Sequence, residues 1–266
     1  MLPRIQSFEF CERAGTPRWL QNALVEIIGM GLRTSNIFQP VAPVLHALCQ
    51  LVCADEILDL GSGSGEPAAL LIEEMNRQGL AAPRFVLSDL LPNLLEMSKT
   101  ASFHPHNLKI VTEPVDAAKI PRQFNQPLRT IINTFHHFPP PLACKILADA
   151  ISRQSAIFIM ESFPRNLHNC WALLPNVFRS YWQNPCRTEQ DRFLKAFFSY
   201  VIPLVGICFT WDSLISIARI YNEAELRKMA RDAGGGHYTW VYEELPYSLR
   251  GRSLLFYGYP SCNLKL

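Results

Sequence analysis

The stretch Ile57–Pro67, with the sequence ILDLGSGSGEP, constrains the fold of this chain more than any other. A short apolar run without helical period contains Asp59 and is followed by three glycines at alternate positions. The run predicts a buried parallel strand, and the glycines predict a turn in a conformation that other residues adopt only with strain. Pro67 suits the first turn of a helix, and helix-forming residues continue from Ala68 to Met75. Strand, glycine turn and helix form the first unit of a nucleotide-binding α/β sheet.

The residue three positions after Gly63 indicates which nucleotide the turn accepts. A dinucleotide fingerprint has glycine or alanine there, where the start of the helix meets the pyrophosphate. This chain has Glu66, whose carboxylate would repel a phosphate, and no Lys-Ser/Thr pair of a P-loop follows. The sequence therefore favours a ligand without a phosphate and disfavours a nicotinamide reductase.

The string DLGSGSGEP resembles motif I of the class I S-adenosylmethionine-dependent methyltransferases, whose cofactor has a sulfonium and no phosphate. The segments SDLLPN, EPVDA, RTIINTFHHFPP, ESFPR and WDSLISIARIYNEAEL are similar to a group of largely uncharacterised bacterial members of that family. The resemblance implies an α/β fold with a seven-stranded, doubly wound, mostly parallel sheet, N-terminal helices and a helical insertion after the fifth strand. It also implies S-adenosylmethionine as the cofactor.

Polar residues stand where the predicted strands end. The second strand covers Phe85–Asp89, the third Leu108–Val111, the fourth Arg129–Asn133 and the fifth Ala156–Met160. The carboxyl ends of parallel strands meet at one edge of a sheet, where ligands bind in open α/β folds. The polar residues at or just past these ends are Asp59, Asp89, Asp116, Asn133 and Glu161.

Asp89 follows the glycines by roughly 20 residues, the distance at which an acid accepts the ribose hydroxyls of a nucleotide. A helix N-cap before Asn93 is the alternative role for Asp89. The resemblance implies that Asp116 accepts the adenine amino group and that the next backbone N–H, of Ala117, meets the ring, although Glu113 is close enough to compete. We expect cofactor contacts at Asp59, Gly61, Ser62, Gly63, Asp89, Asp116, Ala117 and Asn133.

Helices are predicted before and after this core. Thr16 and Pro17 are typical of an N-cap and a first-turn proline, and a second helix is expected from about Pro43. These two helices either cover a sheet edge or form a lid over the cofactor. After Glu161 an aromatic-rich helical insertion is expected to close over the substrate. Its aromatic residues include Trp171, Tyr181, Trp182, Tyr200 and Trp211.

The end of the chain completes the predicted sheet. Asn222–Glu225 form a capping-box pattern that opens a helix ending at Gly234–Gly236. Thr239–Tyr242 and Ser253–Tyr257 alternate as two further strands, which we expect to form a hairpin at the sheet edge. The predicted divisions are 1–52 for the N-terminal helices, 53–164 for the cofactor-binding core, 165–221 for the insertion and 222–266 for the last helix and edge strands.

His136 and Asp212 are the candidate catalytic residues. Some small-molecule O-methyltransferases hold their catalytic histidine in the segment that Phe135–Phe138 resembles, and imidazole titrates near neutral pH, which suits proton removal from a hydroxyl. A packing role beside the cofactor is the alternative for His136. Asp212, Arg219 and Tyr221 are candidates for orienting a polar substrate group. In the alternative interpretation, Asp212 is the N-cap of a helix that begins near Trp211.

Composition argues against several other classes of function. The net charge is +2 and no more than two Lys or Arg residues are adjacent, which disfavours a nucleic-acid surface. The apolar stretch Ala196–Trp211 falls short of the ~20 residues of a membrane span, so we expect buried core or pocket lining there and no membrane partner. His104 and His106 have no cysteine or acid close to them in the sequence, so we expect a surface loop there and no metal site. Eight cysteines without CxxC spacing, and no signal peptide, indicate reduced thiols in a cytoplasmic protein.

Taken with the resemblance, the sequence predicts methyl transfer from S-adenosylmethionine to a small molecule by in-line displacement. The acceptor is expected in a largely closed apolar cavity near Asn133 and His136, with an aromatic residue of the insertion on its wall. The alternatives are an enzyme of the same fold that uses another carbon of the cofactor and releases methylthioadenosine, or a non-catalytic cofactor-binding protein. The sequence is compatible with a homodimer and does not decide the oligomeric state.

Overall fold

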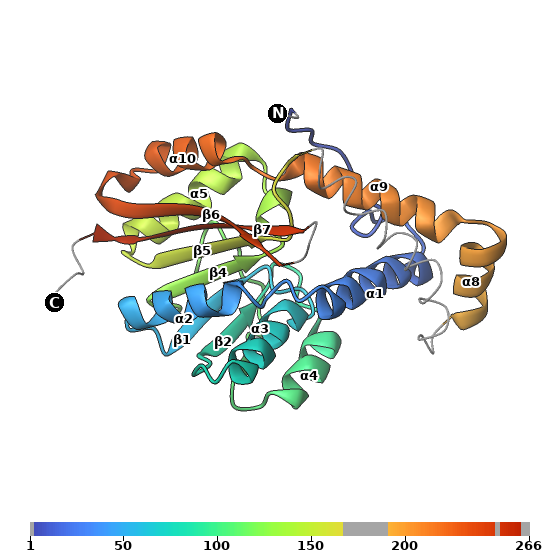
Figure 1. Ribbon diagram of the computed structural model, residues 1–266, viewed down its shortest axis with the longest axis horizontal. Helices are drawn as coiled ribbons and strands as arrows, with labels where there is room; N and C mark the ends of the chain where they lie inside the picture. Colours follow the sequence, from blue (N-terminus) through green and yellow to red (C-terminus); the bar gives the residue numbers. More distant parts are fainter. Residues whose placement is uncertain (1–2, 167–190, 248–250, 262–266) are drawn as a thin grey trace. The chain divides into compact units, whose positions relative to one another are not determined.

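The computed structural model describes residues 3–166, 191–247 and 251–261 (Figure 1). The chain divides into two compact units, which we describe separately. The core unit comprises Ile37–Ser162, Tyr221–Tyr247 and Arg252–Leu266. The helical unit comprises Met1–Asn36, Phe163–Ile220 and Ser248–Gly251.

The core unit is built on a seven-stranded sheet with the order β3-β2-β1-β4-β5-β7-β6. The first five strands are parallel, β7 runs antiparallel to β5, and β6 forms an antiparallel hairpin with β7 at the edge. The predicted fold and its final reversal are confirmed. The strands are β1 (Glu56–Leu60), β2 (Arg84–Ser88), β3 (Leu108–Ile110), β4 (Leu128–Ile132), β5 (Ala156–Glu161), β6 (Tyr238–Pro246) and β7 (Arg252–Pro260).

Helices cover both faces of this sheet, as the buried central strands require. Every residue of β4 and β5 is buried, which is typical of parallel strands that are covered on two sides. In Figure 1, α2, α3 and α4 lie on one face of the sheet, and α5 and α10 pack together on the other. The helices are α2 (Val41–Leu51), α3 (Glu66–Arg77), α4 (Leu94–Phe103), α5 (Pro140–Ser152) and α10 (Glu223–Asp232), with single 3₁₀ turns η1 (Phe135–His137) and η3 (Gly235–His237).

Two predicted helix starts in the core unit can be compared directly with the structure. The capping box of α10 is present: Asn222 Oδ1 accepts the Glu225 N–H, and the Glu225 carboxylate accepts the Asn222 N–H, each at 2.9 Å. Helix α2 begins at Val41, before the expected Pro43, and Pro40 is its N-cap. Pro43 lies in the first turn, where a proline costs no hydrogen bond.

The helical unit contains α1 (Arg18–Thr34), α8 (Arg192–Ala196), the π-helical turn η2 (Phe197–Val201) and α9 (Leu204–Arg219). Its core joins one face of α1 to one face of α9. Apolar side chains at helical spacing on both helices make this core. They are Leu20, Ala23, Leu24 and Ile27 on α1, and Val205, Cys208 and Phe209 on α9.

Three predictions for this unit are wrong. Thr16 does not cap α1, because the helix begins one residue later than expected and Pro17 stands at the N-cap with no side-chain hydrogen bond. Asp212 lies inside α9 and is not an N-cap, because that helix already starts after Pro203. The stretch Ala196–Trp211 is not uniformly buried, since Val201 and Ile207 are exposed. Trp171, Tyr181 and Trp182 lie outside the described residues.

Within the described part of the chain, no single helix is both long enough and apolar enough to cross a membrane. The two helical segments Arg192–Val201 and Leu204–Arg219 meet the criteria of length and composition only as a pair, and they are bent by 81° at the break between them.

Candidate active site at the carboxyl ends of the strands

The glycine turn after β1 has the strained geometry that its sequence predicts. Gly61, Gly63 and Gly65 all have positive φ, at 66°, 56° and 77°. A Cβ at Gly61 would lie 2.9 Å from Thr134 Cγ2, and one at Gly65 would lie 2.5 Å from Leu87 Cδ1. A Cβ at Gly63 would meet no atom within 4 Å. Gly65 therefore lets helix α3 pack closely on β2, whereas the backbone at Gly63 borders open space that a ligand could approach.

Ser62 holds the turn to the neighbouring strand. Its hydroxyl donates to the Asp59 carbonyl oxygen at 3.0 Å and accepts the Ser88 N–H at 3.0 Å. Its own N–H donates to the Ser88 carbonyl, and its carbonyl accepts the Gly65 N–H. The Ser88 hydroxyl also donates to the Asp59 carbonyl, at 2.7 Å. Ser62 was predicted to contact the cofactor, and the structure uses all its polar groups to shape the turn.

Asp59 lies beneath this turn and is almost fully buried. It stands opposite Thr130 in the β1–β4 register, and the Thr130 hydroxyl donates to Asp59 Oδ1 at 2.6 Å. Burial raises the pKa of Asp59 to about 6, although the hydrogen bond from Thr130 acts in the opposite direction. The carboxylate is therefore ionised at neutral pH and is held by a neutral donor.

Asp89 follows β2 and reaches back to the glycine turn. Its Oδ2 accepts the Gly63 N–H at 2.9 Å, and its Oδ1 accepts the Leu91 N–H at 2.9 Å. The N-cap of α4 is Asn93, which accepts the Glu96 N–H, so the alternative role of Asp89 as that cap is wrong. An ionised carboxylate has about four acceptor positions, so Asp89 retains capacity for further donors.

The loop after β3 brings Asp116 and Ala117 next to this acid. The Val115 N–H donates to the Asp89 carbonyl at 2.8 Å, which joins the two strand ends. Asp116 is exposed, and its Oδ1 accepts the Ala118 N–H at 2.9 Å. None of the hydrogen bonds of the described residues uses the N–H of Ala117. The loop thus presents a carboxylate next to a backbone N–H donor.

Asn133 follows β4 in an unusual backbone conformation, with φ of 56°. Its N–H donates to the Met160 carbonyl at 2.8 Å, and its Oδ1 accepts the Ser162 hydroxyl at 2.7 Å. In the described part of the chain, the buried Asn133 Nδ2 has no hydrogen-bond partner. A positive φ in a residue other than glycine and an unsatisfied buried donor are both typical of functional positions.

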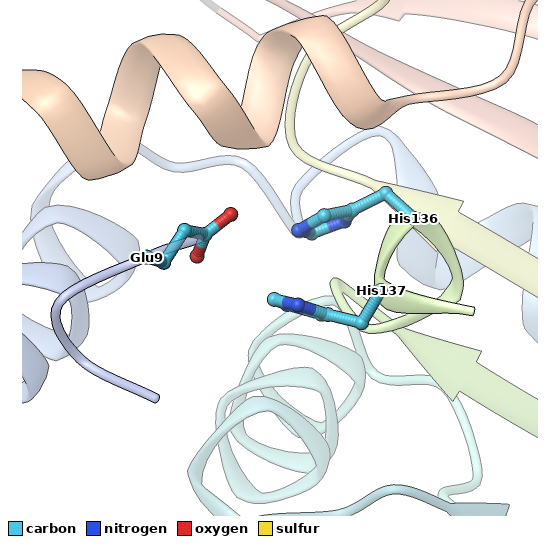
Figure 2. Close-up of side chains that lie close together, drawn as sticks. All are labelled: Glu9, His136 and His137. Atoms are coloured by element: carbon cyan, nitrogen blue, oxygen red, sulfur yellow. The ribbon is translucent and has the colours of Figure 1, made fainter. Parts of the chain in front are cut away.

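His136 forms a two-point contact with Glu161 at the end of β5. One carboxylate oxygen accepts the His136 N–H at 2.9 Å, and the other lies 2.7 Å from His136 Nδ1. Because an ionised carboxylate only accepts, Nδ1 carries the proton and Nε2 is the basic nitrogen. Figure 2 shows the rings of His136 and His137 side by side on η1, with centroids 4.0 Å apart. Histidine fixed by a carboxylate is the arrangement of a general base.

Asp212 and Arg219 belong to the helical unit and have structural partners there. Asp212 accepts the Phe10 N–H at 2.7 Å and the Cys11 N–H at 2.9 Å, and burial raises its pKa. Arg219 pairs with Glu9 at 2.9 Å. These contacts hold the N-terminal segment along α9. They account for the two buried charges of α9 without a substrate.

Several contributors to the site have no local signal in the sequence. Glu161 was recognised as a polar strand end, but its pairing with His136 depends on the alignment of η1 with β5. Thr130, Ser88 and Ser162 were not predicted at all. Their roles could have been found only from the register of neighbouring strands, since each bonds a residue between 26 and 71 positions away.

The chain matches no protein-family model and no curated protein. Among solved structures it is similar to a candidate O-methyltransferase from Nostoc punctiforme, with 15% identity, a TM-score of 0.52, and coverage of 96% of this chain and 64% of that one. It is also similar to the methyltransferase domain of bacterial CtHen1-C, with 10% identity, a TM-score of 0.50, and coverage of 85% and 100%. The chain has the class I methyltransferase fold.

At these identities the likeness establishes the class I methyltransferase fold and not a substrate. The chain spans 64% of the Nostoc protein's length. An O-methyltransferase family protein from Burkholderia thailandensis is 17% identical, with a TM-score of 0.46 and coverage of 84% of this chain and 56% of that one. The reaction, the cofactor and the substrate must therefore be inferred from the residues at the strand ends.

Proposed function

We propose that this protein is an S-adenosylmethionine-dependent methyltransferase that acts on a small molecule. The observation that carries the proposal is the Asp89 carboxylate bonded to the open backbone at Gly63. This pair combines a ribose acceptor with a close backbone approach. Glu66, the first residue of α3, would repel the phosphates of a dinucleotide at the helix N-terminus and leaves a sulfonium nucleoside unhindered.

Each of the residues along the strand ends would bind a different part of the cofactor. Asp89 would accept the ribose hydroxyls, and Asp116 with the Ala117 N–H would recognise adenine. The unsatisfied Nδ2 of Asn133 suits the carboxylate of the cofactor's amino acid part. Asp59 and Ser62 act by positioning, because their polar groups are used to hold the turn.

The bound cofactor supplies an electrophilic methyl group and leaves as a neutral thioether. Alignment alone supplies much of the acceleration in such a displacement. A hydroxyl or amine acceptor must also lose a proton, which His136 Nε2 would take. Glu161 would keep the His136 ring in place and stabilise the imidazolium, because both its oxygens already bond His136. For Asp212 the backbone contacts favour a positioning role within the helical unit.

Product analysis tests this proposal against its closest alternative. The protein is incubated with S-adenosylmethionine and a panel of small phenols, alcohols and amines, and the nucleoside products are separated by mass spectrometry. Methyl transfer gives S-adenosylhomocysteine and a methylated acceptor. Methylthioadenosine would instead identify transfer of another carbon of the cofactor, and binding without any product would favour a non-catalytic role.

A further inference from the structure

Two imidazole rings lie against each other in the turn that follows β4. His136 and His137 are consecutive residues of η1, a 3₁₀ turn with about three residues per turn, so their side chains would ordinarily diverge by about 120°. Instead the ring centroids are 4.0 Å apart, and Figure 2 shows both rings extending from η1 to the same side. One ring nitrogen of His136 lies within 4.8 Å of one of His137. The pair therefore offers two nitrogen donors close enough to share one ion.

Glu161 fixes the protonation of the first of these rings. Its carboxylate accepts the His136 Nδ1–H at 2.7 Å, and the two side chains are almost fully buried, with 7% of His136 and 4% of Glu161 exposed. The lone pair of the His136 ring is therefore on Nε2. Metal-binding histidines are typically held in this way, because a carboxylate on one ring nitrogen orients the ring and makes the other nitrogen a stronger ligand.

The donor atoms determine which ions this pair would bind. Imidazole nitrogens suit zinc and other divalent transition metals, whereas magnesium and calcium prefer oxygen ligands. Among the described residues, no cysteine belongs to this cluster, so it has no thiolate that would favour monovalent copper. Zinc binds imidazole at about 2.0–2.1 Å, so the two nitrogens must come within about 4.2 Å of each other, which small ring rotations would achieve. His137 is partly exposed, which gives a hydrated ion access to the pair.

We propose that His136 Nε2 and a ring nitrogen of His137 bind a zinc ion between them. Such a site differs from our sequence-based expectation that the chain has no metal site. The consequence for catalysis rests on the proposed function: a zinc ion on Nε2 takes the electron pair that would otherwise accept the proton of a hydroxyl substrate. Zinc should therefore inhibit methyl transfer and not assist it.

Metal titration of the full chain tests the site without reference to activity. Protein that has been stripped with EDTA and desalted is titrated with zinc chloride and, separately, with magnesium chloride in a calorimeter. The parent should bind zinc saturably and show no binding of magnesium. His136→Gln and His137→Gln should each lose this binding, because each variant keeps only one of the two imidazole ligands. Glu161→Gln should weaken zinc binding about 10–100-fold, the usual effect of losing the carboxylate behind a metal-bound histidine.

A histidine in another part of the core unit provides the matched control. His104, the C-cap of α4, has its Nε2 3.2 Å from a carboxylate oxygen of Glu73, so His104→Gln also removes an imidazole beside a carboxylate. This variant should bind zinc like the parent, and cysteine thiols elsewhere contribute equally to all of these titrations. Thermal unfolding of the metal-free variants checks that each fold is retained, and His137→Gln carries the test if His136→Gln does not fold.

Three binding results would overturn the proposal: no saturable zinc binding by the parent, parent-like binding by His137→Gln, or equal loss of binding in His104→Gln. In the activity assay, zinc should inhibit the parent at the concentrations at which it binds, and magnesium should not. Stimulation by zinc would overturn the inhibitory role. Zinc binding without any effect on activity would support the site and contradict the role of His136 as proton acceptor, so failure of the site and failure of the proposed function are distinguishable.

Discussion

The Asp89 carboxylate accepts the backbone N–H of Gly63 at 2.9 Å, which joins the end of β2 to the glycine turn across 26 residues of sequence. The contact orients the carboxylate toward the part of the turn that has open space beside it. The turn, the acid and the adjacent Asp116 loop thus form one connected edge of the sheet. Substitutions along this edge and in the His136–Glu161 pair should separate cofactor binding, proton removal and stability.

Replacing Asp89 should weaken cofactor binding more than it weakens the fold. Asp89→Ala removes charge-assisted hydrogen bonds worth about 1.5–3 kcal/mol, so S-adenosylhomocysteine should bind about ten- to a hundredfold more weakly in calorimetry. Glu113→Ala is the control: it removes an exposed acid that competes only with Asp116 for the adenine contact, and it should leave affinity unchanged. If the two variants exchange these behaviours, or if Asp89→Ala binds like the parent, the assignment of Asp89 to the ribose is wrong.

The two histidines of η1 should differ in their effect on catalysis. His136→Gln should lower kcat for a hydroxyl acceptor by about 10²–10⁴-fold, the range for loss of a general base, and Glu161→Gln should lower it in the same direction. Affinity for S-adenosylhomocysteine should change little. His137→Gln is the control and should retain most activity. Equal losses in both histidine variants would indicate packing beside the cofactor and not proton removal.

Asp59 should make stability fall as pH rises through the weakly acidic range. Burial raises its pKa from 3.8 to about 6, so the folded protein binds this proton more tightly than the unfolded chain does. The stabilisation from this proton is fully present below pH 3.8 and is lost as the pH rises to about 6. Above that pH it does not change further. The parent should lose about 2–3 kcal/mol of unfolding free energy across this window. The Asp59→Asn variant should not show this loss. The check is urea unfolding of parent and variant at several pH values, and a stability difference that does not vary with pH would contradict the raised pKa of Asp59.

Alanine at two glycines of the turn should separate packing from ligand approach. Gly65→Ala adds positive-φ strain and a clash with Leu87, and should cost about 2–4 kcal/mol of unfolding free energy. Gly63→Ala adds the strain alone, about 1–2 kcal/mol. Its Cβ would project into the open space, so it should weaken S-adenosylhomocysteine binding. Thermal unfolding and calorimetry on both variants measure this, and a larger stability loss for Gly63→Ala would contradict it.

The sequence was sufficient for the sheet because each strand has a local cause. The apolar run before Gly61, the capping box at Asn222 and the alternation in β6 and β7 all act within a few residues. The strands β6 and β7 extend further than predicted, since their pairing continues from Tyr238↔Pro260 to Pro246↔Arg252 beyond the clearly alternating residues.

The site was less predictable because its contacts join separate strand ends. The pairing of His136 with Glu161 depends on how η1 aligns with β5, which no local pattern encodes. Asp212 illustrates the opposite error. A tryptophan-aspartate pair resembles a helix start, but the helix is already established from Leu204, and the carboxylate instead binds backbone near the N-terminus.

Titration calorimetry with S-adenosylhomocysteine and NAD, on the same preparation, decides whether the strand ends accept S-adenosylmethionine or a dinucleotide. We expect saturable binding of S-adenosylhomocysteine and none of NAD at the same concentrations, because under the proposed function the Glu66 carboxylate would repel phosphates at the start of α3 and Asp89 would accept the ribose hydroxyls. Binding of NAD without binding of S-adenosylhomocysteine would contradict the proposed function and the roles assigned to Glu66, Asp89 and Asp116.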